Sequence, residues 1–156
     1  MDVDGYTWVQ RGVISRAQAL QNMTEGQLRW KLTRGDWQTI HPGVYLTHRG
    51  ELSWDARTWA ALLHCGPAAA LSLDSAAFLH GFERQQPLRV HIDVPHYLHP
   101  ERLNGVRIRR RRRLPVVRRH GRPVTAAAFT VVDLAGQPHT SRIDAVAVAA
   151  RSVHPP

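Results

Sequence analysis

Two segments near the start of the chain combine a capping residue with apolar residues at helical spacing. Ser15 is followed three positions later by Gln18, and Thr24 is followed three positions later by Gln27. A hydroxyl residue with a glutamine at this distance marks the first turn of a helix, because each side chain bonds to the backbone N–H of the other residue. Gly35 then supplies a stop signal. The pattern predicts two short helices joined by a brief turn.

The segment after Gly35 changes to a strand-like pattern. Residues 37–40 and 44–47 are β-prone runs on either side of His41-Pro42-Gly43, and this arrangement predicts a tight hairpin. Two short helices followed by a hairpin are typical of a winged helix-turn-helix, whose second helix enters the major groove of DNA. We therefore expect an N-terminal winged helix-turn-helix DNA-binding domain over residues 1–50.

Helical geometry divides the second helix into two faces. Leu28 and Leu32 are four residues apart and should point into the core. Glutamine and arginine on the opposite face can read adenine and guanine edges, while flanking cations suit phosphates. Trp30 has two interpretations, a DNA contact or core packing against the hairpin. The expected DNA contacts are Gln27, Arg29, Trp30, Lys31, Thr33 and Arg34 of the helix, with Gly26 beside them, and His41 of the hairpin.

The remainder of the chain predicts a small mixed α/β domain over residues 51–156. Ser53, Thr125 and the pair Ser141 and Asp144 are candidate helix caps, and Gly81 is a stop. Helices are expected at 54–64, 72–80, 126–134 and 142–153, and strands at 89–94, 106–109 and 116–119. In the first strand Val90, Ile92 and Val94 alternate with Arg89, His91 and Asp93, which predicts a half-buried strand. The order of elements indicates an α+β fold.

Composition narrows the class of partner. The chain has 156 residues, is 43% hydrophobic and carries a formal charge of +9, so a polyanion such as nucleic acid is the expected partner. No apolar run approaches the roughly 20 residues that span a bilayer, and the start of the chain lacks the pattern of a secretory signal. Cys65 is the single cysteine, which excludes an internal disulfide and suits a reducing cytoplasm.

A run of arginines forms a second candidate site. Arg109, Arg110, Arg111 and Arg112 are consecutive, and such a density of cations suits phosphate contacts along DNA. Two other interpretations stay open. The run can be a solvated face enriched by codon bias, since Lys31 is the only lysine among 21 basic residues, or it can bind an acidic protein surface.

Metal binding and catalysis are not expected. His91, Asp93, His96 and His99 lie close together, but their spacing matches no standard zinc pattern, and Asp93 has arginines as cross-strand partners. The chain has no Gly-rich phosphate loop, no Gly-x-Ser-x-Gly and no lysine two residues after a carboxylate, as some nucleases require. We therefore predict neither a cofactor nor an enzyme.

The chain resembles a known family at Gly12-Val13-Ile14-Ser15-Arg16, Trp37 and His41-Pro42-Gly43-Val44-Tyr45. These residues look like the N-terminal domain of AbiEi-type antitoxins of type IV toxin–antitoxin systems, in the version common in actinobacterial genomes. The resemblance continues more weakly at 54–81, 94–96 and 124–135. It implies a winged helix that binds operator DNA and represses its own operon, followed by a domain that counters a nucleotidyltransferase toxin.

The resulting prediction is a cytoplasmic DNA-binding repressor and antitoxin that regulates its own operon. The expected partners are double-stranded operator DNA, with an inverted repeat if the protein is a homodimer, and a nucleotidyltransferase-like toxin. A narrow apolar stripe in the last helix, Ile143, Val146, Ala147 and Ala150, would support the homodimer. Two alternatives are an interaction module in which residues from 87 onward restrain a toxin, and a truncated remnant of a longer endonuclease-like relative.

Overall fold

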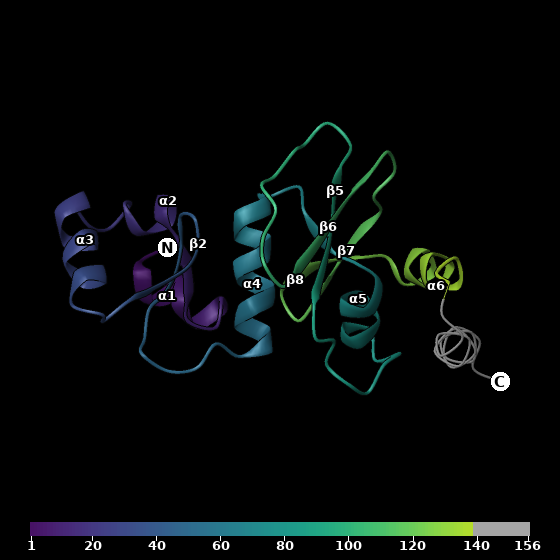
Figure 1. Ribbon diagram of the computed structural model, residues 1–156, viewed down its shortest axis with the longest axis horizontal. Coiled ribbons are helices and arrows are strands. Elements are labelled where there is room, and N and C mark those ends of the chain that lie inside the picture. The colour runs from purple at the N-terminus through teal and green to yellow at the C-terminus, as the bar shows by residue number, and fades with distance from the viewer. Residues whose placement is uncertain (139–156) are drawn as a thin grey trace. The chain divides into compact units, whose positions relative to one another are not determined.

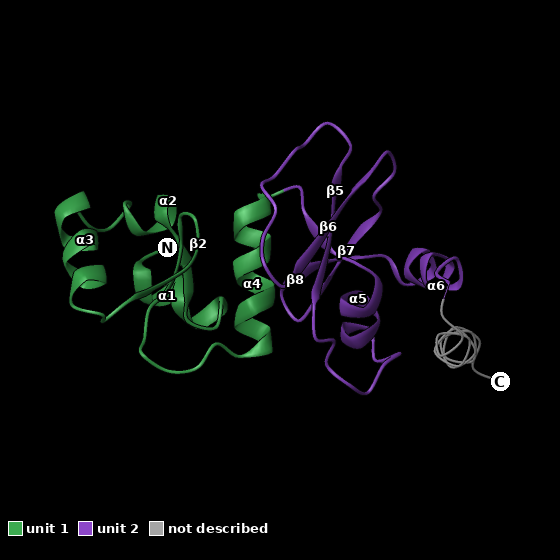
Figure 2. Ribbon diagram, in the orientation of Figure 1, with its two compact units in different colours: residues 1–67 green, residues 68–156 purple. Residues whose placement is uncertain are grey.

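The computed structural model describes residues 1–138. The chain divides into two compact units, residues 1–67 and residues 68–156 (Figure 2). The predicted last helix, with its stripe of small apolar residues, lies outside the described residues. Within residues 1–138, every helix is too short or too polar to cross a membrane.

The first unit combines helices with a small antiparallel sheet (Figure 1). Its strands lie in the order β1-β3-β2, and β3 pairs antiparallel with both neighbours. In chain order the elements are α1 (Val3–Val9), β1 (Val13–Ser15), α2 (Arg16–Ala19), α3 (Glu25–Thr33), β2 (Gln38–His41), β3 (Val44–Leu46) and α4 (Trp54–Cys65). The sequence analysis missed α1, which begins after its cap Asp2, and the short strand β1.

Side-chain caps set the starts of α2 and α3, as predicted. The Ser15 hydroxyl accepts the N–H of Gln18, and the Gln18 side chain accepts the N–H of Ser15. Thr24 and Gln27 form the same reciprocal pair. Gly35 follows the end of α3 with a φ of 72°, a left-handed conformation that glycine adopts without strain. The two predicted helices and the hairpin after them are therefore confirmed.

Two apolar clusters hold the first unit together. One lies between the sheet and helices α2 and α3, and consists of Ile14, Ala19, Leu28, Trp37 and Tyr45. The other lies between the sheet and α4, and consists of Val13, Val44, Leu46, Ala56 and Ala60. Neighbouring residues of β1 join different clusters because successive side chains of a strand point to opposite faces. Helix α4 thus packs in the first unit, whereas the sequence analysis grouped it with the second domain.

The second unit contains a mixed sheet with one helix packed against it and a second helix packed against the first (Figure 1). The strands lie in the order β6-β5-β4-β8-β7. The pairs β5–β6 and β4–β8 are parallel, and β4–β5 and β7–β8 are antiparallel. The elements are β4 (Ala70–Leu71), α5 (Leu73–Leu79), β5 (Val90–Pro95), β6 (Val106–Arg111), β7 (Val116–Arg119), β8 (Arg122–Thr125) and α6 (Ala127–Ala135). The chain is α+β, as predicted.

Strand β5 differs from the expectation of a half-buried strand. All residues from 90 to 94 are buried, including the polar side chains of His91 and Asp93. The strand lies between β4 and β6, and α5 packs against it. The alternating pattern therefore identified a strand correctly, but its polar face is covered instead of solvated.

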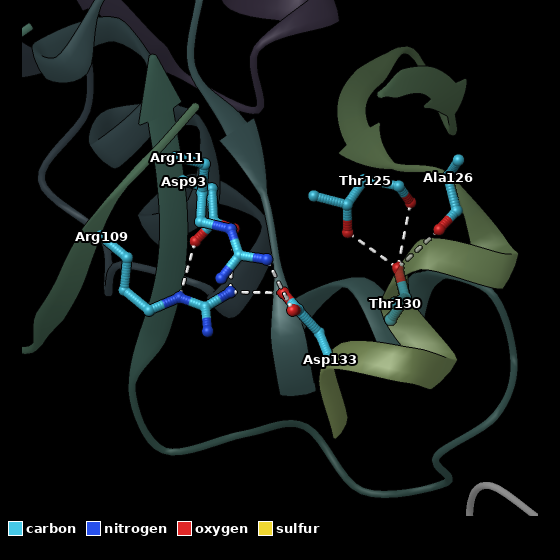
Figure 3. A network of polar contacts seen from close by, with 7 residues as sticks. All are labelled: Asp93, Arg109, Arg111, Thr125, Ala126, Thr130 and Asp133. Atoms are coloured by element: carbon cyan, nitrogen blue, oxygen red, sulfur yellow. Dashed lines mark hydrogen bonds and ion pairs between the residues drawn. The ribbon is translucent and has the colours of Figure 1, made fainter. Parts of the chain in front are cut away.

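The start of α6 also differs from the prediction. Thr125 is the last residue of β8, and the N-cap is Ala126, which makes no side-chain cap bond. The buried Thr130 hydroxyl instead lies 2.7 Å from the Thr125 hydroxyl and 3.0 Å from the Ala126 carbonyl oxygen (Figure 3). Leu134 packs with Leu73 and Ala77 of α5. Helix α6 is thereby fixed both at its start and along its inner face.

Candidate nucleic-acid interface

The outer face of α3 is exposed where the helical geometry placed it. Leu28 is buried and Leu32 packs beside it, so the core of the first unit fixes the rotation of the helix. The exposed residues on the other side are Gly26, Gln27, Arg29, Trp30, Thr33 and Arg34. Lys31 is half-buried. Most residues that the sequence analysis assigned to DNA are therefore accessible on one helix.

Arg34 is held in place by two contacts. Its guanidinium carbon lies 4.3 Å from the centroid of the Trp30 ring, a cation–π arrangement. Its Nε lies 3.4 Å from a carboxylate oxygen of Asp36. This ion pair uses Nε and not the two terminal nitrogens, which are the donors that a guanine O6 and N7 require. The end of α3 thus presents a positioned arginine to solvent.

Trp30 supports this arginine instead of packing as core. The side chain is 55% exposed, and among the described residues it joins neither apolar cluster of the first unit. The fold therefore does not support packing of Trp30 against the hairpin. Its ring lies under Arg34 and limits the conformations available to that long side chain.

Gln27 and Lys31 make contacts within their own unit. The amide oxygen of Gln27 accepts the N–H of Thr24 at 2.8 Å. Reading an adenine requires both the oxygen and the nitrogen of a glutamine amide, so this cap competes with a base contact. The ammonium of Lys31 lies 5.4 Å from the centroid of the buried Trp37 ring. Arg29 is accordingly better placed than Lys31 for a phosphate.

His41 ends β2 beside the hairpin turn and is half-buried. Its ring packs edge-on against that of His64, with centroids 6.0 Å apart. Burial, and to a smaller extent the neighbouring His64, lowers the pKa of His41 from its ordinary value of 6.5. His41 is therefore mostly neutral at pH 7, and it suits a hydrogen bond better than a charged phosphate contact.

Arg49 belongs to this surface, and sequence reasoning missed it. Its Nη2 lies 2.6 Å from Asp36, the carboxylate that also contacts Arg34. The same nitrogen donates to the Arg34 carbonyl oxygen at 3.4 Å. Asp36 therefore joins two exposed arginines from different loops into one group. A cation soon after the hairpin is visible in the sequence, but its pairing with Asp36 depends on how the two loops meet.

Two members of the arginine run bind carboxylates inside the second unit (Figure 3). Arg109 donates to both oxygens of Asp93 at 2.9 and 2.8 Å, and to Asp133 of α6 at 2.7 Å. Arg111 donates to the other oxygen of Asp133 at 2.8 Å. Asp93 and Arg109 are register partners in the parallel pair β5–β6, so the expected cross-strand arginine of Asp93 is confirmed.

Electrostatics explains why this network tolerates burial. Asp93 is fully buried, and the Arg109 side chain is largely buried. Burial disfavours the charged guanidinium, but hydrogen bonds and attraction from Asp93, and then from Asp133, outweigh it and raise the pKa of Arg109. Arg109 and Arg111 thus have a structural role in this unit, and Arg110 and Arg112 are the exposed members of the predicted phosphate patch.

The histidines near β5 do not form a metal site with Asp93 in the part of the chain that the structure describes. Asp93 is occupied by Arg109. His91 lies 3.9 Å from Asp74, and His99 lies 3.0 Å from a guanidinium nitrogen of Arg110. These side chains have separate partners instead of a common centre.

The buried ion-pair network lies in the part of the chain that a known family shares. A family model described as the AbiEi antitoxin C-terminal domain matches residues 68–154, which is more than half of the chain. The chain belongs to the AbiEi antitoxin family. The predicted family is thus confirmed, although residues 10–47, which mainly carry the resemblance, lie outside the matched segment. The match starts where the second compact unit of this AbiEi protein starts. No curated protein matches the chain.

Proposed function

We propose that this AbiEi-family antitoxin is a sequence-specific DNA-binding repressor of its own operon. The observation that carries the proposal is the exposed outer face of α3, where Arg34 is held between Trp30 and Asp36. An arginine positioned at a helix surface can donate to a guanine with little further loss of conformational freedom.

The order of elements in the first unit supports this function. A helix and a short strand precede α2 and α3, and the β2–β3 hairpin follows them. This is the element order of a winged helix-turn-helix, in which α3 would enter the major groove and the hairpin would serve as the wing. The turn between α2 and α3 is short, as the motif requires.

Charge supports the same assignment. Arg29, Arg34 and Arg49 are exposed cations on or beside α3. The nearby carboxylates are already paired, Glu25 with Arg16 and Asp36 with two arginines. The formal charge of the whole chain is +9, which favours association with a polyanion.

Membership of an antitoxin family supports a role in counteracting a toxin. We propose that this toxin is nucleotidyltransferase-like, that both proteins act in the cytoplasm, and that the repressor binds as a homodimer to an inverted repeat. Two copies of a winged helix related by a two-fold axis match the symmetry of such an operator.

The first prediction tests which arginine reads sequence. Arg34→Ala should lower the affinity for a duplex from the chain's own promoter by about 1 to 3 kcal/mol, while affinity for a scrambled duplex changes little. Arg29→Ala should weaken both duplexes to a similar extent, because a phosphate contact carries no sequence information. Gel-shift titrations at fixed salt measure both effects.

The matched control is Arg84→Ala, an exposed arginine of the second unit. It should leave both affinities unchanged. A wild-type chain that binds the two duplexes equally, or an Arg34→Ala variant that keeps its full preference, would refute the proposed reading helix.

A further inference from the structure

Strand β7 forms one end of the second unit's sheet and is exposed along its whole length. Within the described residues, β8 is its strand neighbour and no strand pairs with its other edge. All four residues are exposed. They include two valines on opposite faces, Val116 at 46% and Val117 at 39% exposure. An exposed edge with apolar side chains is a template for pairing with another strand.

The hairpin register shows which backbone groups face outward. The turn between β7 and β8 is His120-Gly121, with φ values of 49° and 77°, as a two-residue type I′ turn requires. Arg119 and Arg122 flank the turn and form the first hydrogen-bonded pair, so Val117 and Val124 form the next. The N–H and C=O groups of Val116 and Arg118 therefore point away from β8.

The position of a proline agrees with this register. Pro123 lies opposite Arg118. A proline has no N–H to donate, and at a non-hydrogen-bonded position the β7–β8 ladder requires none from it. The outward direction of the N–H and C=O groups of Val116 and Arg118 therefore follows from the regular pairing of the hairpin.

Charge selects the kind of strand that can pair here. Residues 102–132 contain no aspartate or glutamate. Arg112 and Arg113 precede β7, and Arg118 and Arg119 lie on it, all of them exposed. The two β7 arginines are held near the hairpin, since Arg118 donates to the Gly121 carbonyl and Arg119 donates to His80. The edge is thus uniformly positive.

We propose that β7 binds an extended, acidic strand of a partner protein by strand addition. A second copy of this chain fits poorly, because antiparallel pairing of two β7 strands would bring four arginines together. Nucleic acid would use the arginines but neither the outward backbone groups nor the valines. A strand with carboxylates and β-branched residues uses all three, as in other cases of β-augmentation. This inference is independent of DNA binding by the first unit.

The experiment selects binders from a displayed library of random eight-residue peptides against the full chain. We expect enrichment of sequences that alternate acidic and β-branched residues. Val116→Pro removes an outward N–H without removing a bond to β8, and should weaken the selected peptides about tenfold. Val116→Ala is the matched control, because it shortens the same side chain and keeps the N–H. Fluorescence anisotropy measures the affinities.

Further variants separate the sources of binding. Arg118→Glu should also weaken the acidic peptides at least about tenfold, since it replaces attraction by repulsion. Arg34→Ala should leave peptide binding unchanged. A failure of the DNA-binding proposal can therefore be distinguished from a failure of strand addition. If Val116→Pro fails to fold, peptides N-methylated at alternate residues test the complementary bonds on the wild-type chain, those from peptide N–H groups to the outward C=O groups of β7, and loss of binding is the expected result.

Several outcomes would overturn strand addition. One is a library that yields no binders, or binders that keep full affinity for Val116→Pro. Another is displacement of the peptides by a scrambled DNA duplex whose binding is weakened by Arg118→Glu but not by Val116→Pro. A third is a wild-type dimer in sedimentation that Val116→Pro abolishes, which would make a second copy the occupant.

Discussion

His80 shows how a single side chain can link two elements of the second unit. It follows α5, and its Nε2–H donates to the Thr125 carbonyl oxygen of β8 at 2.8 Å. Its Nδ1 accepts a hydrogen bond from Arg119 Nε at 3.3 Å. Burial lowers the pKa of His80 from its ordinary 6.5, the bond to Thr125 partly opposes this, and the charge of Arg119 lowers it further. The fold therefore favours neutral His80.

This shift predicts a pH dependence of stability. The unfolded chain takes up a proton at His80 near pH 6.5, whereas the folded chain does so only at lower pH. The free energy of unfolding should thus be level above pH 7 and fall as the pH drops through 6.5 toward the folded pKa. His41 has a lowered pKa as well and should act in the same direction. Urea unfolding between pH 5 and 8 measures the slope.

His80→Gln should make this slope shallower, and His80→Gln combined with His41→Gln should reduce it further. The control is His96→Gln, an exposed histidine outside the β7–β8 hairpin. A double variant with the wild-type slope would show that these two histidines do not set the acid sensitivity.

Cys65 illustrates the other consequence of burial at the residue scale. The side chain is buried near the end of α4, and desolvation raises the pKa of its thiol to about 11. Because the thiolate is the reactive form, this cysteine is a core residue and not a nucleophile at neutral pH.

At the scale of elements, one carboxylate ties α6 to the sheet. Asp133 accepts hydrogen bonds from Arg109 and Arg111 of β6, and the Arg111 guanidinium also lies 5.2 Å from the centroid of the Phe129 ring. The Asp133 side chain is mostly buried, so its attraction to the arginines is only weakly screened.

Asp133→Asn should therefore lower the free energy of unfolding by about 1.5 to 3 kcal/mol, the usual range for hydrogen bonds to charged groups. Urea denaturation followed by circular dichroism measures this loss. Glu101→Gln removes an exposed carboxylate of the same unit and serves as the control. Equal stability of Asp133→Asn and the wild type would mean that the Asp133 bonds add little to the apolar contacts with α5 and the Thr130 hydrogen bonds that also hold α6.

At the scale of the whole molecule, the excess of positive charge predicts a strong effect of salt on DNA affinity. The logarithm of the binding constant should fall linearly with the logarithm of salt concentration, by about 0.9 for each contacted phosphate. Arg110 and Arg112 are the exposed members of the arginine run. If both contact phosphates, replacing them with serine should make the slope shallower by about 1.8.

Replacing the exposed Arg84 and Arg102 with serine changes the formal charge equally and provides the comparison. A slope reduced to the same extent by both double variants would indicate a general charge effect. Wild-type slopes in both would assign the arginine run to a partner other than DNA or to a solvated face.

Local interactions in the sequence determined where α2 and α3 begin. The reciprocal caps of Ser15 with Gln18 and of Thr24 with Gln27 join residues three positions apart. Helical periodicity likewise fixed the exposed face of α3, because Leu28 and Leu32 had to be inward. These features depend on neighbours along the chain, so the sequence alone was sufficient to predict them.

Only the tertiary structure decided the environment of the polar residues in the second unit. The alternation in β5 is the same whether a polar face is solvated or covered, and covering it requires α5 and the Arg109 side chain of β6 from other parts of the chain. Arg109 and Arg110 are equivalent in a sequence of consecutive arginines, yet Arg109 faces Asp93 and Asp133 while Arg110 is exposed. Which arginine is internal depends on strand register and on helix docking, and both arise from contacts between residues distant in sequence.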